Sequence, residues 1–333
     1  MATELKKTVK PSGGDYTSLE ACMNANEQNL VAGDKYFNVE IDGDWTAAPD
    51  TTNVLVHNYT VDATRNIRIY AVGTAKHNGT PYKATAYVLR GAADTGTAFR
   101  TSSTAQHYLR VSDFVIDCQN QAKCAIDEYY AATDARFIRM VLCNSSHATA
   151  TLLFNPDSVS IAINCILFNV TRGIRCSNGG SFAYNCTVLG GNTPTLGILY
   201  VTAINCYVGG FAAECFYLLK AGSDYCVSSD NSADDECAHY ALGKSTYADY
   251  FVNVGGGTED YHLKDTSANL WGLAGSDLSA IFTDDIDGVA RTVPWDVGAD
   301  EYVGGAPPAF FAYPGIFDQL RGGLSAYTGG LKT

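Results

Sequence analysis

The central part of the sequence repeats Asn-Cys between apolar residues three times. The segments AINCILF (162–168), AYNCTVL (183–189) and AINCYVG (203–209) follow one another at intervals of 21 and 20 residues, and SDYCVSS (223–229) keeps only the cysteine. Within each copy, apolar side chains recur with a period of two, which predicts short strands that return once per coil. Further apolar segments lie between the copies, so each coil is expected to contain at least two strands.

Stacked coils of nearly constant length form a solenoid, in which each coil contacts only its neighbours. We therefore predict an all-β fold, a single-stranded parallel β-helix with an N-terminal capping helix and an irregular C-terminal tail. The expected organisation is an N-terminal segment with the capping helix (1–30), the parallel β-helix (31–302) and an aromatic, Gly- and Pro-rich C-terminal cap or docking arm (303–333).

The repeated cysteines and asparagines are expected to form vertical columns. In-register coils lie roughly 4.8 Å apart, too far for the convergent Cβ atoms of a disulfide, so the cysteines are expected to be free thiols. Asn tolerates the left-handed conformation at a corner, and its amide is able to bond the Asn above and below. The alternation leaves open whether the Cys or the Asn faces inward. The column residues are Cys165, Cys186, Cys206, Cys226, Asn164, Asn185 and Asn205.

A short amphipathic helix is expected near the start, in GGDYTSLEACMNANEQNL. Thr17 and Glu20 have the spacing of a capping box, and an apolar stripe follows from Leu19 through Cys22 and Met23. Such a helix would cover the open edge of the first coil.

Two terminal motifs carry a resemblance to a known family. DDIDGVARTVPWDVGADEY (284–302) resembles the D-x-D-G-x-x-R … D-[IV]-G-A-x-E-Y ending of the pectin-lyase-like superfamily, and TVKPSGGDYTSLEAC resembles the start of such proteins. The resemblance implies a right-handed parallel β-helix over roughly residues 8–302. It implies no single function, because that scaffold carries lyases, hydrolases, adhesins and phage appendages.

Charge and composition exclude several classes of partner. The net charge of −13 argues against nucleic acid, whose phosphates require clustered Lys and Arg. No stretch of about 18 apolar residues is present, which argues against a membrane span. The lysines of the amino terminus are not followed by an apolar run, so no signal peptide is expected. The eleven cysteines fit folding in a reducing cytoplasm.

No set of catalytic residues matches the lyases or hydrolases of the superfamily. The sequence contains neither a nucleotide-binding motif nor a catalytic nucleophile motif. The six histidines do not have the spacing of a zinc site, so we predict no zinc site. We expect no cofactor. An acidic loop is a weak candidate for binding calcium, but it is better interpreted as a solvent-exposed loop between coils. TDDIDG (283–288) is interpreted as a turn. The weak metal candidates are Asp230, Asp234, Asp235 and Glu236.

Aromatic residues in polar segments are weak candidates for contact with a glycan or a protein partner, with packing between coils as the alternative. They are Trp45, Tyr129, Tyr130, Tyr247 and Tyr250. The tail after Tyr302 is aromatic and nearly uncharged, which predicts either a fold-back cap or an arm that docks on a neighbouring subunit. Its assembly residues are Phe310, Phe311, Tyr313, Phe317 and Tyr327.

Three functions remain as hypotheses. The first is a non-catalytic structural or appendage protein of a tailed-phage particle, in the head or the tail. Its expected partners are other virion proteins, its favoured assembly is a homotrimer, and a host-surface glycan is a further candidate ligand. The second is a polysaccharide lyase or glycoside hydrolase on the same scaffold. The third is a bacterial surface adhesin, against which the missing signal peptide counts.

Overall fold

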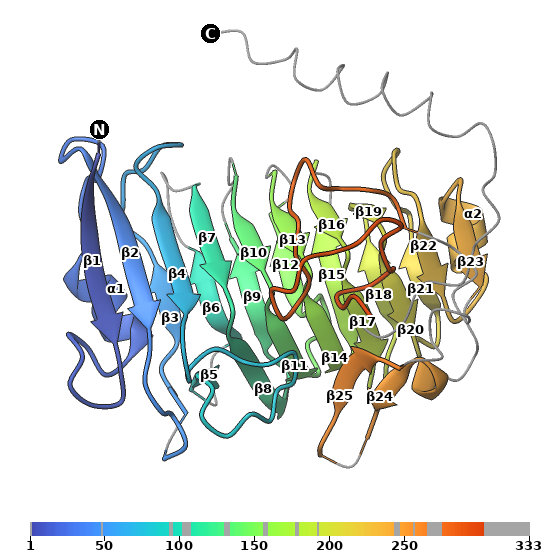
Figure 1. Ribbon diagram of the computed structural model, residues 1–333, viewed down its shortest axis with the longest axis horizontal. Helices are drawn as coiled ribbons and strands as arrows, with labels where there is room; N and C mark the ends of the chain where they lie inside the picture. Colours follow the sequence, from blue (N-terminus) through green and yellow to red (C-terminus); the bar gives the residue numbers. More distant parts are fainter. Residues whose placement is uncertain are drawn as a thin grey trace, which may run out of the picture.

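Three long parallel β-sheets wind around a common axis and make up most of the chain (Figure 1). The computed structural model describes residues 2–302, except 48, 93–95, 102–107, 130–133, 156–158, 177–179, 192, 243–246, 256 and 265–274. Sheet A contains β1 (Thr3–Val9), β2 (Lys35–Ile41), β4 (Ile67–Ala71), β7 (Leu109–Ser112), β10 (Arg136–Ile138), β13 (Ile161–Ile163), β16 (Phe182–Tyr184) and β19 (Thr202–Ile204).

The other two sheets follow sheet A in each coil. Sheet B contains β5 (Val88–Leu89), β8 (Val115–Gln121), β11 (Val141–Ser145), β14 (Ile166–Val170), β17 (Thr187–Gly190), β20 (Tyr207–Gly209), β22 (Cys226–Ser228) and β23 (Tyr240–Leu242). Sheet C contains β3 (Val54–Val56), β6 (Thr97–Thr101), β9 (Cys124–Glu128), β12 (Leu152–Phe154), β15 (Arg172–Cys176), β18 (Leu196–Leu199) and β21 (Glu214–Tyr217). A coil of the central part therefore carries three strands, and the predicted parallel β-helix is confirmed.

The Asn-Cys repeat marks the corner between sheets A and B. Each Asn has a positive φ, 50° at Asn164, 47° at Asn185 and 56° at Asn205, which is the left-handed conformation expected of this residue at a corner. The following cysteine points into the solenoid core and is fully buried. The earlier coils place Phe114 and Met140 at the same inward position. The orientation that the sequence left open is thus Cys inward and Asn outward.

The cysteine column is buried along its whole length. Cys165, Cys186, Cys206 and Cys226 are free thiols with no measurable exposure, as predicted. Burial raises the pKa of Cys165 and Cys186 well above the usual thiol value, because a thiolate would lose its hydration inside the core. These cysteines therefore act as small apolar side chains that fill a narrow interior.

Helix α1 (Leu19–Ala25) covers the first coil and buries Leu19, Cys22 and Met23 against the core. Its N-cap is Ser18, whose hydroxyl oxygen accepts the Ala21 N–H at 3.3 Å, so the expected capping role of Thr17 is wrong by one residue. The segment before α1 is more than a cap, because β1 pairs in register with β2 as the first strand of sheet A. The solenoid therefore begins at residue 3 and not at 31.

The solenoid also ends earlier than predicted, at β23. The chain then forms η1 (Tyr247–Asp249) and an antiparallel hairpin of β24 (Phe251–Asn253) and β25 (Asp260–Leu263). Residues 275–302, here called the returning segment, run back along the outside of the coils, as the red trace in Figure 1 shows. The sequence predicts coils up to residue 302, and the structure replaces the last of them with this outer layer.

The hairpin and the returning segment cover apolar side chains on the outer faces of two sheets. Ile166 and Phe168 of sheet B pack in one cluster with Tyr261 of the hairpin, whose ring lies 5.0 Å from that of Phe168. Ile163 and Tyr184 of sheet A pack in another cluster with residues of the returning segment, among them Leu278 and Trp295. Strands that are apolar on both faces are therefore buried on both faces in this part of the molecule.

Candidate functional site

The corner between sheets A and B, together with the hairpin and the returning segment, contains the densest polar network that the structure describes. The Asn column holds the backbone of the returning segment. Asn164 donates to Asp284 O at 2.6 Å, Asn185 donates to Asp296 O at 3.0 Å, and Asn205 donates to Ser276 O at 2.8 Å. Among the described residues, the expected amide ladder is limited to one bond, from Asn205 Nδ2 to Asn185 Oδ1 at 3.1 Å, because the amides mainly bind this second layer.

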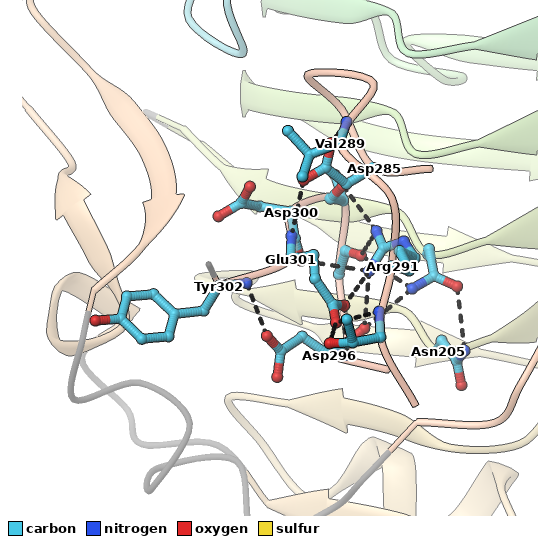
Figure 2. Close-up of polar contacts among 12 residues, drawn as sticks. Asn205, Asp285, Val289, Arg291, Asp296, Asp300, Glu301 and Tyr302 are labelled. Carbon is cyan, nitrogen blue, oxygen red and sulfur yellow. Dashed lines mark hydrogen bonds and ion pairs between the residues drawn. The ribbon is translucent and has the colours of Figure 1, made fainter. Parts of the chain in front are cut away.

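Arg291 lies at the centre of this network with its side chain fully buried (Figure 2). Its Nη2 donates to Asn164 Oδ1 at 3.0 Å, to Gly298 O at 3.0 Å and to Ala299 O at 2.8 Å. Its Nη1 lies 3.1 Å from Glu301 Oε2 in a buried ion pair. Burial lowers the pKa of Arg291, but the acidic residues around it oppose that effect.

Glu301 closes the loop that Arg291 organises. Its Oε1 accepts from Thr292 N at 3.0 Å and its Oε2 accepts from Asp296 N at 2.9 Å. Gly298 has φ +101°, and a Cβ there would lie 2.8 Å from Thr187 Oγ1. The Arg, Gly and Glu of the ending DGVARTVPWDVGADEY are thus the residues that fold the returning segment and fasten it to the coils.

A second group of ionisable residues lies beside this loop. The His262 ring contacts Asp260 through Nδ1, and its Nε2 lies 2.8 Å from Asp287 Oδ2. Burial opposes the charged ring, yet these two hydrogen bonds raise the pKa of His262 to about 11. Asp300 is buried and accepts the Leu263 N–H at 2.7 Å, and burial raises the pKa of its carboxyl to about 7. The group joins the hairpin to the returning segment.

The predicted turn in TDDIDG is confirmed. The Asp285 carboxylate accepts from the backbone N–H groups of Asp287 at 3.0 Å and Val289 at 2.8 Å, and Gly288 has φ +85°. Burial raises the pKa of Asp285, which the N–H groups partly offset. This turn places Asp287 opposite His262.

The loop between β4 and β5 joins the network from an earlier coil. Lys76 Nζ lies 3.1 Å from Asp113 Oδ1 and donates to Asp287 O at 3.1 Å. Arg139 pairs with Asp113 at 2.7 Å and also contacts Asp284. Four segments that are far apart in the sequence are therefore fastened at one corner.

His77, in the same loop, is buried as a neutral ring. Its Nε2 lies 2.6 Å from Arg139 O, and its Nδ1 accepts the Gly79 N–H at 3.0 Å, which fixes the tautomer with the proton on Nε2. Burial lowers the pKa of His77 to about 4. A proton on Nδ1 would break the bond from Gly79.

We expect this histidine to make the protein less stable in acid. The unfolded chain takes up the proton near pH 6.5 and the folded chain only near pH 4, so stability falls as the pH drops through that window and is constant above about pH 7.5. At pH 4.5 the loss from His77 is about 2–3 kcal/mol. Urea unfolding at pH 7.5 and pH 4.5 gives the free energy of unfolding that each protein loses in acid. The contribution of His77 is the loss of the parent minus the loss of His77→Gln. Equal losses in both proteins would contradict the assignment.

The acidic candidates near residue 230 close the far end of the solenoid. Asp230 precedes α2 (Ser232–Glu236), and Glu236 is the last residue of this helix. The carboxylates of both residues accept backbone N–H groups at the free edge of β21. The contacts are Cys215 N with Asp230 Oδ2 (2.8 Å), Phe216 N with Ser232 Oγ (2.9 Å), Leu218 N with Glu236 Oε1 (3.0 Å) and Leu219 N with Glu236 Oε2 (2.9 Å). These side chains take the place of the next strand, which blunts the edge.

Asp234 and Asp235 lie on the exposed side of α2, and neither belongs to a group of three potential metal ligands within the described residues. Asp230, Asp235 and Glu236 line one surface pocket together with Glu214, but Asp230 and Glu236 are engaged there by backbone N–H groups.

Two of the aromatic candidates are wrong, because they are buried. Trp45 is 5% exposed and packs edge-on against Tyr87 at 4.8 Å, and Tyr250 is fully buried against Tyr207 at 5.4 Å. Tyr129 is 50% exposed, with the Arg100 guanidinium 3.9 Å from its ring centroid. Tyr247 lies in η1, but its side chain is outside the described residues, as are Tyr130 and the assembly residues Phe310, Phe311, Tyr313, Phe317 and Tyr327.

His262 and Asp300 are not among the site residues that the sequence predicts. No local spacing links them to Asp287, because the three residues come together only when the hairpin and the returning segment fold onto the coils. The pair DYH (260–262) is the one local signal, since it places Asp260 two residues before the histidine that it contacts.

Comparison with known proteins adds no family to these observations. No known protein family matches the chain, and no curated protein matches it either. Within the described part of the chain, none of the helices has the length and apolar character needed to cross a membrane.

Proposed function

We propose that this chain is a non-catalytic structural or appendage protein of a tailed-phage particle, built as a rigid parallel β-helix. The observation that carries the proposal is the use of polar side chains as fasteners. Asp230 and Glu236 cap a sheet edge, Arg291 and Glu301 fold the returning segment, and the Asn column holds it on the coils. These contacts close the end of the solenoid and hold the outer layer on the coils. The same carboxylates and guanidinium are engaged in these bonds, so we do not assign them to acid–base catalysis.

The pectin-lyase-like resemblance and the C-terminal sequence support the assembly part of this proposal. The ending that resembles this superfamily is the one that Arg291 and Glu301 organise. Residues 303–333 contain five aromatic residues and only three charged ones, a composition suited to burial against other subunits. A homotrimer is the proposed assembly, with other virion proteins as partners and a host-surface glycan as a further ligand.

Two measurements on the full chain test the proposal. Mass spectrometry of purified phage particles from the source is expected to find this chain at a fixed ratio to the major capsid protein. Incubation with polyuronates, with and without calcium, is expected to release no unsaturated or reducing ends. Turnover of a polyuronate, together with absence of the chain from particles, would instead favour a polysaccharide lyase or hydrolase.

The tail is tested by the mass of the assembly in solution. Light scattering is expected to find a trimer for the parent and a smaller species for the double variant Phe310→Asp, Phe311→Asp. The control is Val252→Asp, at an apolar residue of β24 that is 53% exposed. A parent that stays monomeric at micromolar concentration would contradict the assembly role.

A further inference from the structure

We propose that His262, Asp287 and Asp300 form a binding site for a divalent transition-metal cation of the zinc class, which fastens the hairpin to the returning segment. The inference does not depend on the virion role, because it concerns only how two segments of this chain are held together. His262 belongs to β25, Asp287 to the turn after residue 283, and Asp300 to the end of the returning segment.

The geometry of the three side chains is the first argument. One ligand atom of each residue lies within 4.8 Å of the others, and His262 Nε2 is 2.8 Å from Asp287 Oδ2. Ligands bound at about 2.0–2.2 Å to one tetrahedral ion lie roughly 3.3–3.6 Å apart. The His262 and Asp287 side chains would therefore move slightly apart to admit the ion. One imidazole and two carboxylates suit Zn²⁺, with a water molecule as the fourth ligand.

A carboxylate orients the histidine from behind. Asp260 contacts Nδ1 of His262, so that Nε2 faces Asp287 and Asp300. Metal-bound histidines commonly donate their second N–H to a carboxylate in this way, which fixes the ring and raises its basicity. Asp260 is therefore a positioning residue for the proposed site.

An unpartnered carboxylate oxygen is the second, independent argument. Asp287 Oδ1 is shielded from solvent and has no hydrogen-bond partner among the described residues. Asp300 is 6% exposed, and one of its oxygens accepts the Leu263 N–H. Figure 2 shows this carboxylate directed away from Arg291, so the buried ion pair of Arg291 does not neutralise it. Buried oxygens without partners are rare in proteins and call for a ligand.

The backbone of Gly79 lies close to two of the three proposed ligands. A Cβ at this position would lie 2.4 Å from His262 Nε2 and 3.1 Å from Asp287 Oδ1, and the residue has φ +74°. Any other residue would therefore push a side chain against two of the three ligands. The loop that carries Gly79 thus lies directly over the ligand atoms.

The charges around the group also favour a cation. Asp260, Asp285, Asp287 and Asp300 are partly or fully buried here. The positive groups near them are the His262 ring, Lys76, whose Nζ contacts Asp287 O, and Arg291, which attracts Asp285 and Asp300. Without metal, the proton on Nε2 bridges His262 and Asp287. Binding of Zn²⁺ releases that proton to solvent, and the ion takes its place between the two side chains.

The test measures zinc bound to the full chain after treatment with EDTA and dialysis against ZnCl₂. We expect one zinc per chain for the parent and a thermal midpoint that rises with zinc concentration. His262→Gln and Asp300→Asn are expected to bind none, and Asp260→Asn to bind about 10–100-fold more weakly. The matched control is His239→Gln, because His239 pairs with Asp224 at 2.8 Å on the same protein without the other ligands.

Each other outcome would overturn the proposal. If His262→Gln and Asp300→Asn, shown by circular dichroism to be folded, keep one zinc per chain, the metal is bound by thiols or elsewhere. If the folded parent binds no zinc at 100-fold molar excess, the histidine is held only as a proton-bridged pair with its aspartates. If CaCl₂ raises the midpoint and ZnCl₂ does not, the site takes a different class of cation.

Discussion

Replacing Arg291 by methionine is expected to lower the free energy of unfolding by about 3–5 kcal/mol. The guanidinium is fully buried and satisfies Glu301, Asn164 and five backbone carbonyls, so methionine would leave a buried carboxylate without its partner. Denaturation with urea, followed by circular dichroism, measures the change. Arg68→Met serves as the control, since Arg68 is an exposed arginine of sheet A.

A double variant separates the ion pair from the rest of the network. Arg291→Met combined with Glu301→Leu removes both charges, so it should recover part of the stability that the single change loses. Thermal midpoints for Arg291→Met and the parent that agree within error would show that the returning segment contributes little to the stability of the rod.

Replacing Cys186 by aspartate is expected to destabilise the protein by on the order of 4 kcal/mol, because it buries an unpaired charge inside the coils. Cys186 is fully buried between Cys165 and Cys206 and belongs to the hydrophobic core inside the coils. Cys186→Ala and Cys186→Val keep the position apolar, so their effects should be mild. Equal melting temperatures for Cys186→Asp and the parent would place residue 186 outside the core.

The sequence predicted the coils well because a stacked coil repeats the same environment at the same step. Asn-Cys recurs at one corner since each copy meets the same two demands, a left-handed backbone at the Asn and a narrow apolar interior at the Cys. Phe114 and Met140 occupy the same inward position in earlier coils, where the interior is equally apolar. The free thiols followed from the coil spacing alone.

What the sequence could not predict lies outside the coils. Alternation tells which side chains face each way, but it does not tell which outer faces are covered by a second layer. Ile166 and Phe168 are buried by a hairpin that is remote in sequence, and Trp45 is buried where a polar segment predicted exposure. The His262 group was missed for the same reason, because His262 lies in the hairpin and Asp287 and Asp300 lie in the returning segment of that outer layer.

The returning segment has a consequence for where this fold tolerates new sequence. Between Asn164 and Asn205 the chain turns from sheet A to sheet B beneath hydrogen bonds to residues 276–298, so an inserted loop at that turn would have to displace a whole second layer. The long loop from β4 to β5 occurs at the same turn of an earlier coil. Grafted peptides should therefore be accepted at the turns between sheets B and C, and rejected along the Asn column.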